Sequence, residues 1–113
     1  MALTREFKAT VQARARRDPA FRAALLREGV EALLSGDVAA GKIVLRDYIK
    51  ATVGFEAVAK ETGHPAPSLV RMFGPSGNPR ADNLFAVIGY LQKREGVTLA
   101  VKPMRSRSAR KAA

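Results

Sequence analysis

The sequence predicts an all-α fold: a small helical bundle followed by one short C-terminal strand that pairs between chains. Three observations support this prediction. Apolar residues recur at helical spacing along most of the chain, capping residues and glycines separate the runs, and only residues 97–101 alternate as a strand does. With 113 residues, 47% of them apolar and 27% charged, the chain is expected to form a single globular core.

Two helices are predicted at the N-terminal end. Thr4 can cap the first, over residues 5–17, and three residues form its apolar face: Leu3, Phe7 and Val11. Asp18 and Pro19 predict the start of the second helix, because a carboxylate can cap the first turn and proline at the first position loses no hydrogen bond. Four apolar residues of this helix are expected on one face: Leu26, Val30, Leu33 and Leu34.

A third helix is predicted between two breaks that contain glycine. The segment Ser35-Gly36-Asp37 ends the second helix and caps the third, and Gly54 ends the third. Its expected buried side chains are Leu45, Tyr48, Ile49 and Thr52. A last long helix is predicted over residues 80–95, because four apolar residues have the spacing of one helix face: Leu84, Val87, Ile88 and Leu91.

Residues 54–73 have the features of a helix-turn-helix. Ala59 is small enough for two helices to touch there, and Gly63 can adopt the positive φ of a tight turn. Leu69 can reach back from the second helix to the first. Pro65 and Pro67 fall in the turn and in the first helical turn, where no hydrogen-bond donor is lost. Such a motif holds its second helix where it can enter the major groove of DNA.

Two stretches of the chain carry a family resemblance. Residues Phe55 to Phe73 resemble the helix-turn-helix of the Xre/lambda-repressor-like superfamily, with Gly63-His64-Pro65 where that superfamily often has Gly-Val-Ser. The run Met72-Phe73-Gly74-Pro75-Ser76-Gly77-Asn78-Pro79, followed by a helix and Val97-Thr98-Leu99-Ala100-Val101, resembles the HigA-like addiction-module antidote family. The resemblance covers residues 50–101, and the N-terminal helices match only loosely. The two prolines and the low charge of the motif depart from the family pattern.

The resemblance implies a sequence-specific DNA-binding antitoxin of a type II toxin–antitoxin module. Such a protein represses its own operon as a homodimer on a palindromic operator and neutralises a RelE/HigB-like ribonuclease toxin. One alternative is a free-standing Xre-family transcriptional regulator without a toxin partner. Another is a helical scaffold protein that uses the same shape for protein contacts.

The exposed positions of the second motif helix are expected to meet DNA, because Leu69, Met72 and Phe73 must face the core. These positions are Ala66, Ser68, Val70 and Arg71. Arg71 is the one side chain among them that can bind guanine with two hydrogen bonds, although an ordinary solvated arginine is the alternative. In the following loop, three residues are expected to contact backbone phosphates: Ser76, Asn78 and Arg80.

The strand predicted at residues 97–101 has no second strand to pair with in the sequence. Its alternating residues Val97, Leu99 and Val101 are therefore expected to form a dimer contact, in which the strand pairs with its own copy across a two-fold axis. The alternative is that the strand adds to the edge of a toxin sheet.

The net charge and the basic tail indicate which kind of partner the protein has. The net charge is +10, and five basic residues fall in the tail 102–113: Lys102, Arg105, Arg107, Arg110 and Lys111. A basic tail favours a nucleic-acid partner, although a tail that only aids solubility is the alternative. The domain prediction is one helical unit over residues 1–101 and a disordered tail over 102–113.

We predict no enzyme activity, no cofactor and no metal site. No nucleophile–base arrangement is evident, the single histidine, His64, falls in a turn, and the sequence contains no cysteine. No apolar run approaches the roughly 20 residues of a membrane helix. The expected location is cytoplasmic, and nucleoid-associated when the protein is bound to DNA, with no membrane partner.

Overall fold

The computed structural model describes residues 5–106 and confirms the all-α prediction. Six helices occur there, and no strand is present in that range. The helices are α1 (Arg5–Arg17), α2 (Pro19–Leu34), α3 (Val38–Ala51), α4 (Gly54–Thr62), α5 (Ala66–Met72) and α6 (Ala81–Glu95). None of the helices in the described part of the chain is long and apolar enough to cross a membrane.

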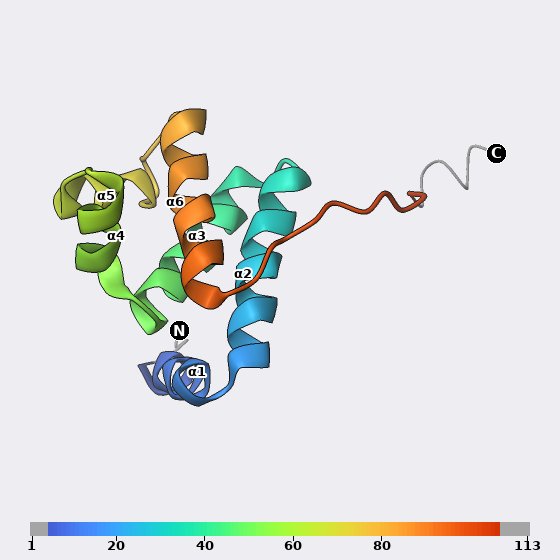
Figure 1. Ribbon diagram of the computed structural model, residues 1–113, viewed down its shortest axis with the longest axis horizontal. Coiled ribbons are helices and arrows are strands. Elements are labelled where there is room, and N and C mark those ends of the chain that lie inside the picture. Colours follow the sequence, from blue (N-terminus) through green and yellow to red (C-terminus); the bar gives the residue numbers. More distant parts are fainter. Residues whose placement is uncertain (1–4, 107–113) are drawn as a thin grey trace.

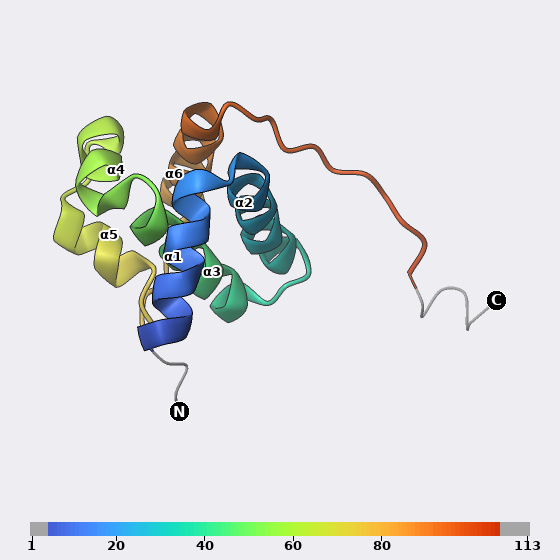
Figure 2. The same ribbon diagram turned by 90° about the horizontal axis from the view of Figure 1, so that it is seen from below.

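Helix α6 has neighbouring helices on three sides. Helix α6 lies between α2 and the α4–α5 pair, with α3 behind it (Figure 1). The view from below shows the same order, with α1 crossing in front of α3 (Figure 2). Helices α2 and α3 are in close contact because two glycines leave room for leucine side chains of the neighbouring helix: Leu45 lies against Gly29, and Leu33 lies against Gly41.

The core combines residues from α2 to α6. Its largest fully buried side chains include Leu26 of α2, Tyr48 of α3 and Leu69 of α5, and the four predicted residues of α6 are all buried. The prediction for Leu34 is wrong, because this residue ends α2 and 63% of it is exposed. The adjacent Leu33 packs against Gly41 of α3, whereas Leu34 is mostly exposed, and periodicity alone could not reveal which of the two is covered.

Two aspartates cap helices as the sequence predicted. The Asp18 carboxylate accepts a hydrogen bond from the Phe21 backbone N–H at the start of α2, and the Asp37 carboxylate accepts one from Ala40 at the start of α3. The bond from Phe21 lowers the pKa of Asp18, because it stabilises the charged form. The predictions that concern Leu3, Thr4 and the Phe7 side chain lie outside the described residues, as does the predicted disorder of residues 107–113.

Residues 97–101 form no strand within the described chain. The Val97 N–H donates to the Gln92 carbonyl and closes the end of α6, and the Leu99 N–H donates to the Gln92 side-chain oxygen at 2.8 Å. Val97 and Leu99 are half-buried against the core of their own chain, whereas Val101 is 77% exposed. Two backbone donors of the segment therefore bond within the chain. Pairing with a second copy stays a prediction.

Candidate nucleic-acid interface

A short turn joins α4 to α5. Gly63 ends α4 with a φ of 79°, in the left-handed region that favours glycine, and its N–H donates to the Ala59 carbonyl. Pro65 is extended and precedes α5, and its carbonyl accepts the first helical hydrogen bond, from Leu69. Three residues thus separate the two helices, and a new helix begins among the prolines, as the sequence predicted.

Helix α5 has a buried side and an exposed side. Leu69 is fully buried, Phe73 after the helix is 1% exposed, and its ring centroid lies 6.2 Å from that of Phe55 at the start of α4. On the other side Val70 is 46% exposed and Arg71 is exposed. These contacts fix the helix to the body and leave its outer side open to a partner.

The four predicted DNA-facing positions on α5 are not equally accessible. Val70 and Arg71 are exposed, whereas Ala66 and Ser68 are half-buried. The Arg71 guanidinium donates a hydrogen bond to the Ser68 hydroxyl at 3.4 Å, so these two side chains lie together on one face. Within residues 5–106 Arg71 forms no ion pair, and its remaining donors are therefore open to an anion or a base edge.

The loop after α5 folds back onto the end of that helix. The Gly74 N–H donates to the Arg71 carbonyl, and the Gly77 N–H donates to the Gly74 carbonyl. A Cβ atom at Gly77 would lie 2.1 Å from the Arg71 carbonyl oxygen. Only glycine fits there without a shift of the backbone, so the position of the loop relative to α5 is closely determined.

A buried lysine also holds this loop in place. Lys42 of α3 is 6% exposed, and its ammonium donates to the carbonyls of Gly74 at 2.9 Å and Gly77 at 2.7 Å. An ammonium that is removed from water must find acceptors, and the two loop carbonyls supply them. Lys42 therefore ties the loop to α3.

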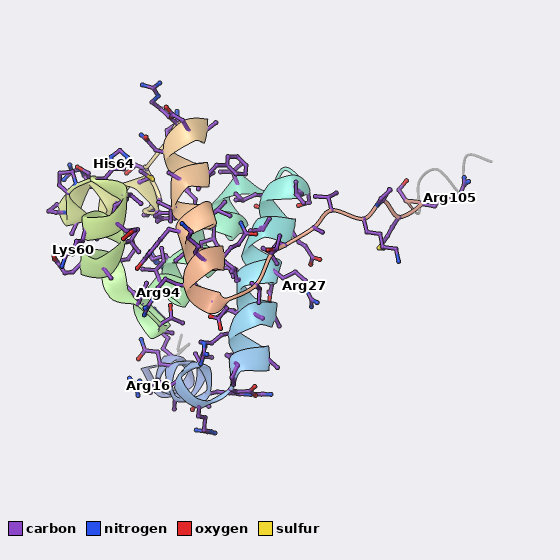
Figure 3. All side chains as sticks on the ribbon, in the orientation of Figure 1. Arg16, Arg27, Lys60, His64, Arg94 and Arg105 are labelled. Atoms are coloured by element: carbon purple, nitrogen blue, oxygen red, sulfur yellow. The ribbon has the colours of Figure 1, made fainter. Side chains whose placement is uncertain are left out.

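Three residues of this segment were predicted to contact phosphates. Ser76, Asn78 and Arg80 are all exposed. The Arg80 guanidinium lies 3.5 Å from a carboxylate oxygen of Asp82, but both side chains are mostly exposed, and such surface pairs are weak. His64, which was predicted to be a turn residue, is half-buried in the turn before α5, and Lys60 lies nearby on α4 (Figure 3).

Sequence reasoning missed Lys42. The signal was present: Lys42 precedes Leu45 by three residues and Ile49 by seven, so it falls on the buried face of α3. A lysine on that face predicts a buried acceptor for its ammonium, but it does not say which part of the chain provides the acceptor.

A set of partly buried polar residues joins the end of α6 to three other helices. Arg22 of α2 donates to both carboxylate oxygens of Glu95, at 3.1 and 3.0 Å, and also to the Ala15 carbonyl of α1. The Tyr48 hydroxyl donates to the same carboxylate. Burial and this hydrogen bond raise the pKa of Tyr48 well above its ordinary value, because both disfavour the charged form of the phenol.

No family model, curated protein or solved structure matches the chain. The described residues contain no group of three or more histidine, cysteine, aspartate or glutamate side chains that could hold a metal ion.

Proposed function

We propose that the protein binds double-stranded DNA, with α5 as the helix that enters the major groove. One observation carries this proposal. Leu69 and Phe73 anchor α5 to the core, while Val70 and Arg71 are exposed on a helix that follows a three-residue turn, and Arg71 forms no ion pair within residues 5–106. A short anchored helix with an exposed arginine fits the geometry by which helix-turn-helix proteins read base edges.

Each exposed group has a distinct role in this proposal. The Arg71 guanidinium can donate two hydrogen bonds to the O6 and N7 atoms of guanine, and Val70 can pack against a thymine methyl group. Ser68, which already accepts a hydrogen bond from Arg71, can orient that guanidinium. The loop residues Ser76 and Asn78 supply uncharged donors for phosphates, which fix the register of the protein on the duplex.

The net charge of the whole chain supports the same partner. The net charge is +10, yet residues 54–82 carry three basic residues (Lys60, Arg71, Arg80) and three acidic ones (Glu56, Glu61, Asp82). The general attraction to phosphates must therefore come mainly from the flanking segments, and α5 contributes base preference.

We expect Arg71→Ala to weaken binding at the preferred DNA site by roughly 1–3 kcal/mol, because a two-bond contact to guanine is lost. The preferred site is first obtained by selection from a random duplex library, and affinity is then measured by fluorescence anisotropy. Binding to unrelated duplex DNA should change little.

Arg27→Ala is the matched control for this measurement. Arg27 is an exposed arginine on α2, and Figure 3 shows it on the opposite side of the molecule from α4. If Arg71→Ala and Arg27→Ala bind the selected site alike, α5 is not the reading helix. If the selection yields no preferred sequence, specific DNA binding is rejected.

We propose further that the protein acts as the antitoxin of a toxin–antitoxin pair. The support for this part is the resemblance of residues 72–79 and 97–101 to HigA-like antidotes. Co-expression with a small basic protein encoded by an adjacent gene should give a complex on purification, with relief of growth arrest caused by that protein. A DNA-binding protein that neither binds nor neutralises such a neighbour would instead be a free-standing regulator.

A further inference from the structure

An open cavity lies where the C-terminal ends of α1, α3 and α6 come together. Its volume is about 280 Å³, just below the range of pockets for drug-sized ligands, so it suits a smaller molecule. Three arginines and one carboxylate line it: Arg16 of α1, Arg22 of α2, and Arg94 and Glu95 of α6. A concave site with several guanidinium groups is typical of anion recognition.

The buried part of this lining is already neutral. The Glu95 side chain is 6% exposed, and its carboxylate accepts hydrogen bonds from Arg22 and from the Tyr48 hydroxyl. The Arg22 guanidinium also donates to the Ala15 carbonyl near the end of α1. Arg22 and Glu95 therefore compensate each other's charge.

The other two arginines of the cavity have no partner in the described part of the chain. Arg16 and Arg94 are exposed, and neither guanidinium forms an ion pair or a hydrogen bond within residues 5–106. Figure 3 shows them on the same side of the molecule. Glu61 of α4 lines a neighbouring groove together with Arg94, and the two are not paired. The cavity therefore has an excess of two positive charges.

The helix ends around the cavity do not need these two arginines as caps. Arg22 bonds to carbonyls at the end of α1, the Thr52 hydroxyl bonds to a carbonyl of α3, and the Gly96 N–H bonds to carbonyls of α6. An arginine that neither caps a helix nor pairs with a carboxylate keeps all its side-chain donors for a ligand.

We propose that the cavity binds a small phosphate monoester. A guanidinium group presents parallel N–H donors that match phosphate oxygens, so Arg16 and Arg94 can hold one phosphate between them. A monoester carries a charge of about −1.5 to −2 at pH 7, which matches the excess charge of the cavity, whereas a phosphodiester carries a single charge. Three apolar residues of the lining can face the organic group: Ala15, Ala51 and Val53.

This site is separate from the proposed DNA contacts. None of the residues that line the cavity belongs to α5 or to the loop over residues 74–80. The inference does not depend on DNA binding and is tested without DNA, so its failure would leave the test of Arg71 unaffected.

Isothermal titration calorimetry of the full chain with two probes, methyl phosphate and dimethyl phosphate, tests the inference. Methyl phosphate should bind with a dissociation constant on the order of 1 mM or lower, and dimethyl phosphate, a model of the DNA backbone, at least about tenfold more weakly. Arg94→Gln and Arg16→Gln should each weaken methyl phosphate binding about tenfold, because charged hydrogen bonds to the phosphate are lost. Both positions are exposed, so two independent variants are available if one does not fold.

Arg27→Gln is the matched control, because Arg27 is an exposed arginine of α2 that does not line the cavity. It should bind methyl phosphate as the wild type does. Absence of saturable binding, or equal effects of all three substitutions, would overturn the inference. Equal affinity for the two probes would assign the cavity to backbone phosphates of a nucleic acid and overturn it as well.

Discussion

Glu95→Ala is expected to lower the free energy of unfolding by about 3 kcal/mol, the low end of the range for breaking a buried ion pair. The Glu95 side chain is 6% exposed and accepts hydrogen bonds from Arg22 and Tyr48. Its removal leaves the Arg22 charge, which is only 25% exposed, without a carboxylate, and leaves the Tyr48 hydroxyl without this acceptor. Urea unfolding followed by circular dichroism measures the change.

Glu28→Ala and a double variant serve as comparisons for this experiment. Glu28 is exposed on α2, so its substitution should change stability by no more than about 0.5 kcal/mol. The combined change Arg22→Met with Glu95→Leu removes both charges and should recover most of the loss. A Glu95→Ala protein as stable as Glu28→Ala would mean that the network contributes nothing to folding.

Lys42→Met is expected to cost about 2–3 kcal/mol of stability, because hydrogen bonds to two loop carbonyls are lost from a buried site. Methionine has nearly the same length and apolar character as the lysine stem, so the packing of α3 should be preserved. The loop over residues 74–77 should become more mobile, since its two hydrogen bonds to Lys42 of α3 are lost. Hydrogen exchange of the loop amides reports this mobility separately from global stability.

Lys50→Met is the matched control for this substitution. Lys50 is on the same helix but exposed, and it should unfold as the wild type does. If the loop positions phosphate-contacting residues, as proposed, Lys42→Met should also weaken DNA binding at every sequence rather than alter base preference. Loop amides that stay protected in Lys42→Met would contradict the role assigned to the lysine.

Much of the fold could be predicted from the sequence because its signals are local. The caps at Asp18 and Asp37 depend on hydrogen bonds over three residues, and the break at Gly63 depends on the backbone freedom of that residue. The buried face of α6 follows from spacing alone. On α5, the burial of Leu69 and the exposure of Arg71 follow from the same periodicity. This part of the candidate interface could therefore be predicted from the sequence.

Other features depended on residues that are distant in the chain. The ammonium of Lys42 bonds to carbonyls 32 and 35 residues later, and Arg22 bonds to a carboxylate 73 residues away. Which partner a buried charge finds is set by the packing of whole helices, and no local pattern contains that information. The end of α2 illustrates the same limit, because Leu34 continues the apolar pattern and yet remains exposed.

The sequence by itself determined the helices, their caps and the outward side of α5, because each depends on contacts between residues within one or two helical turns. Only the tertiary structure decided that Lys42 holds the loop after α5. It also decided that the Leu99 backbone N–H donates to the Gln92 side chain instead of remaining without an acceptor in its own chain. The physical reason is that burial and hydrogen-bond partners are properties of the packed chain, whereas periodicity and capping are properties of a segment.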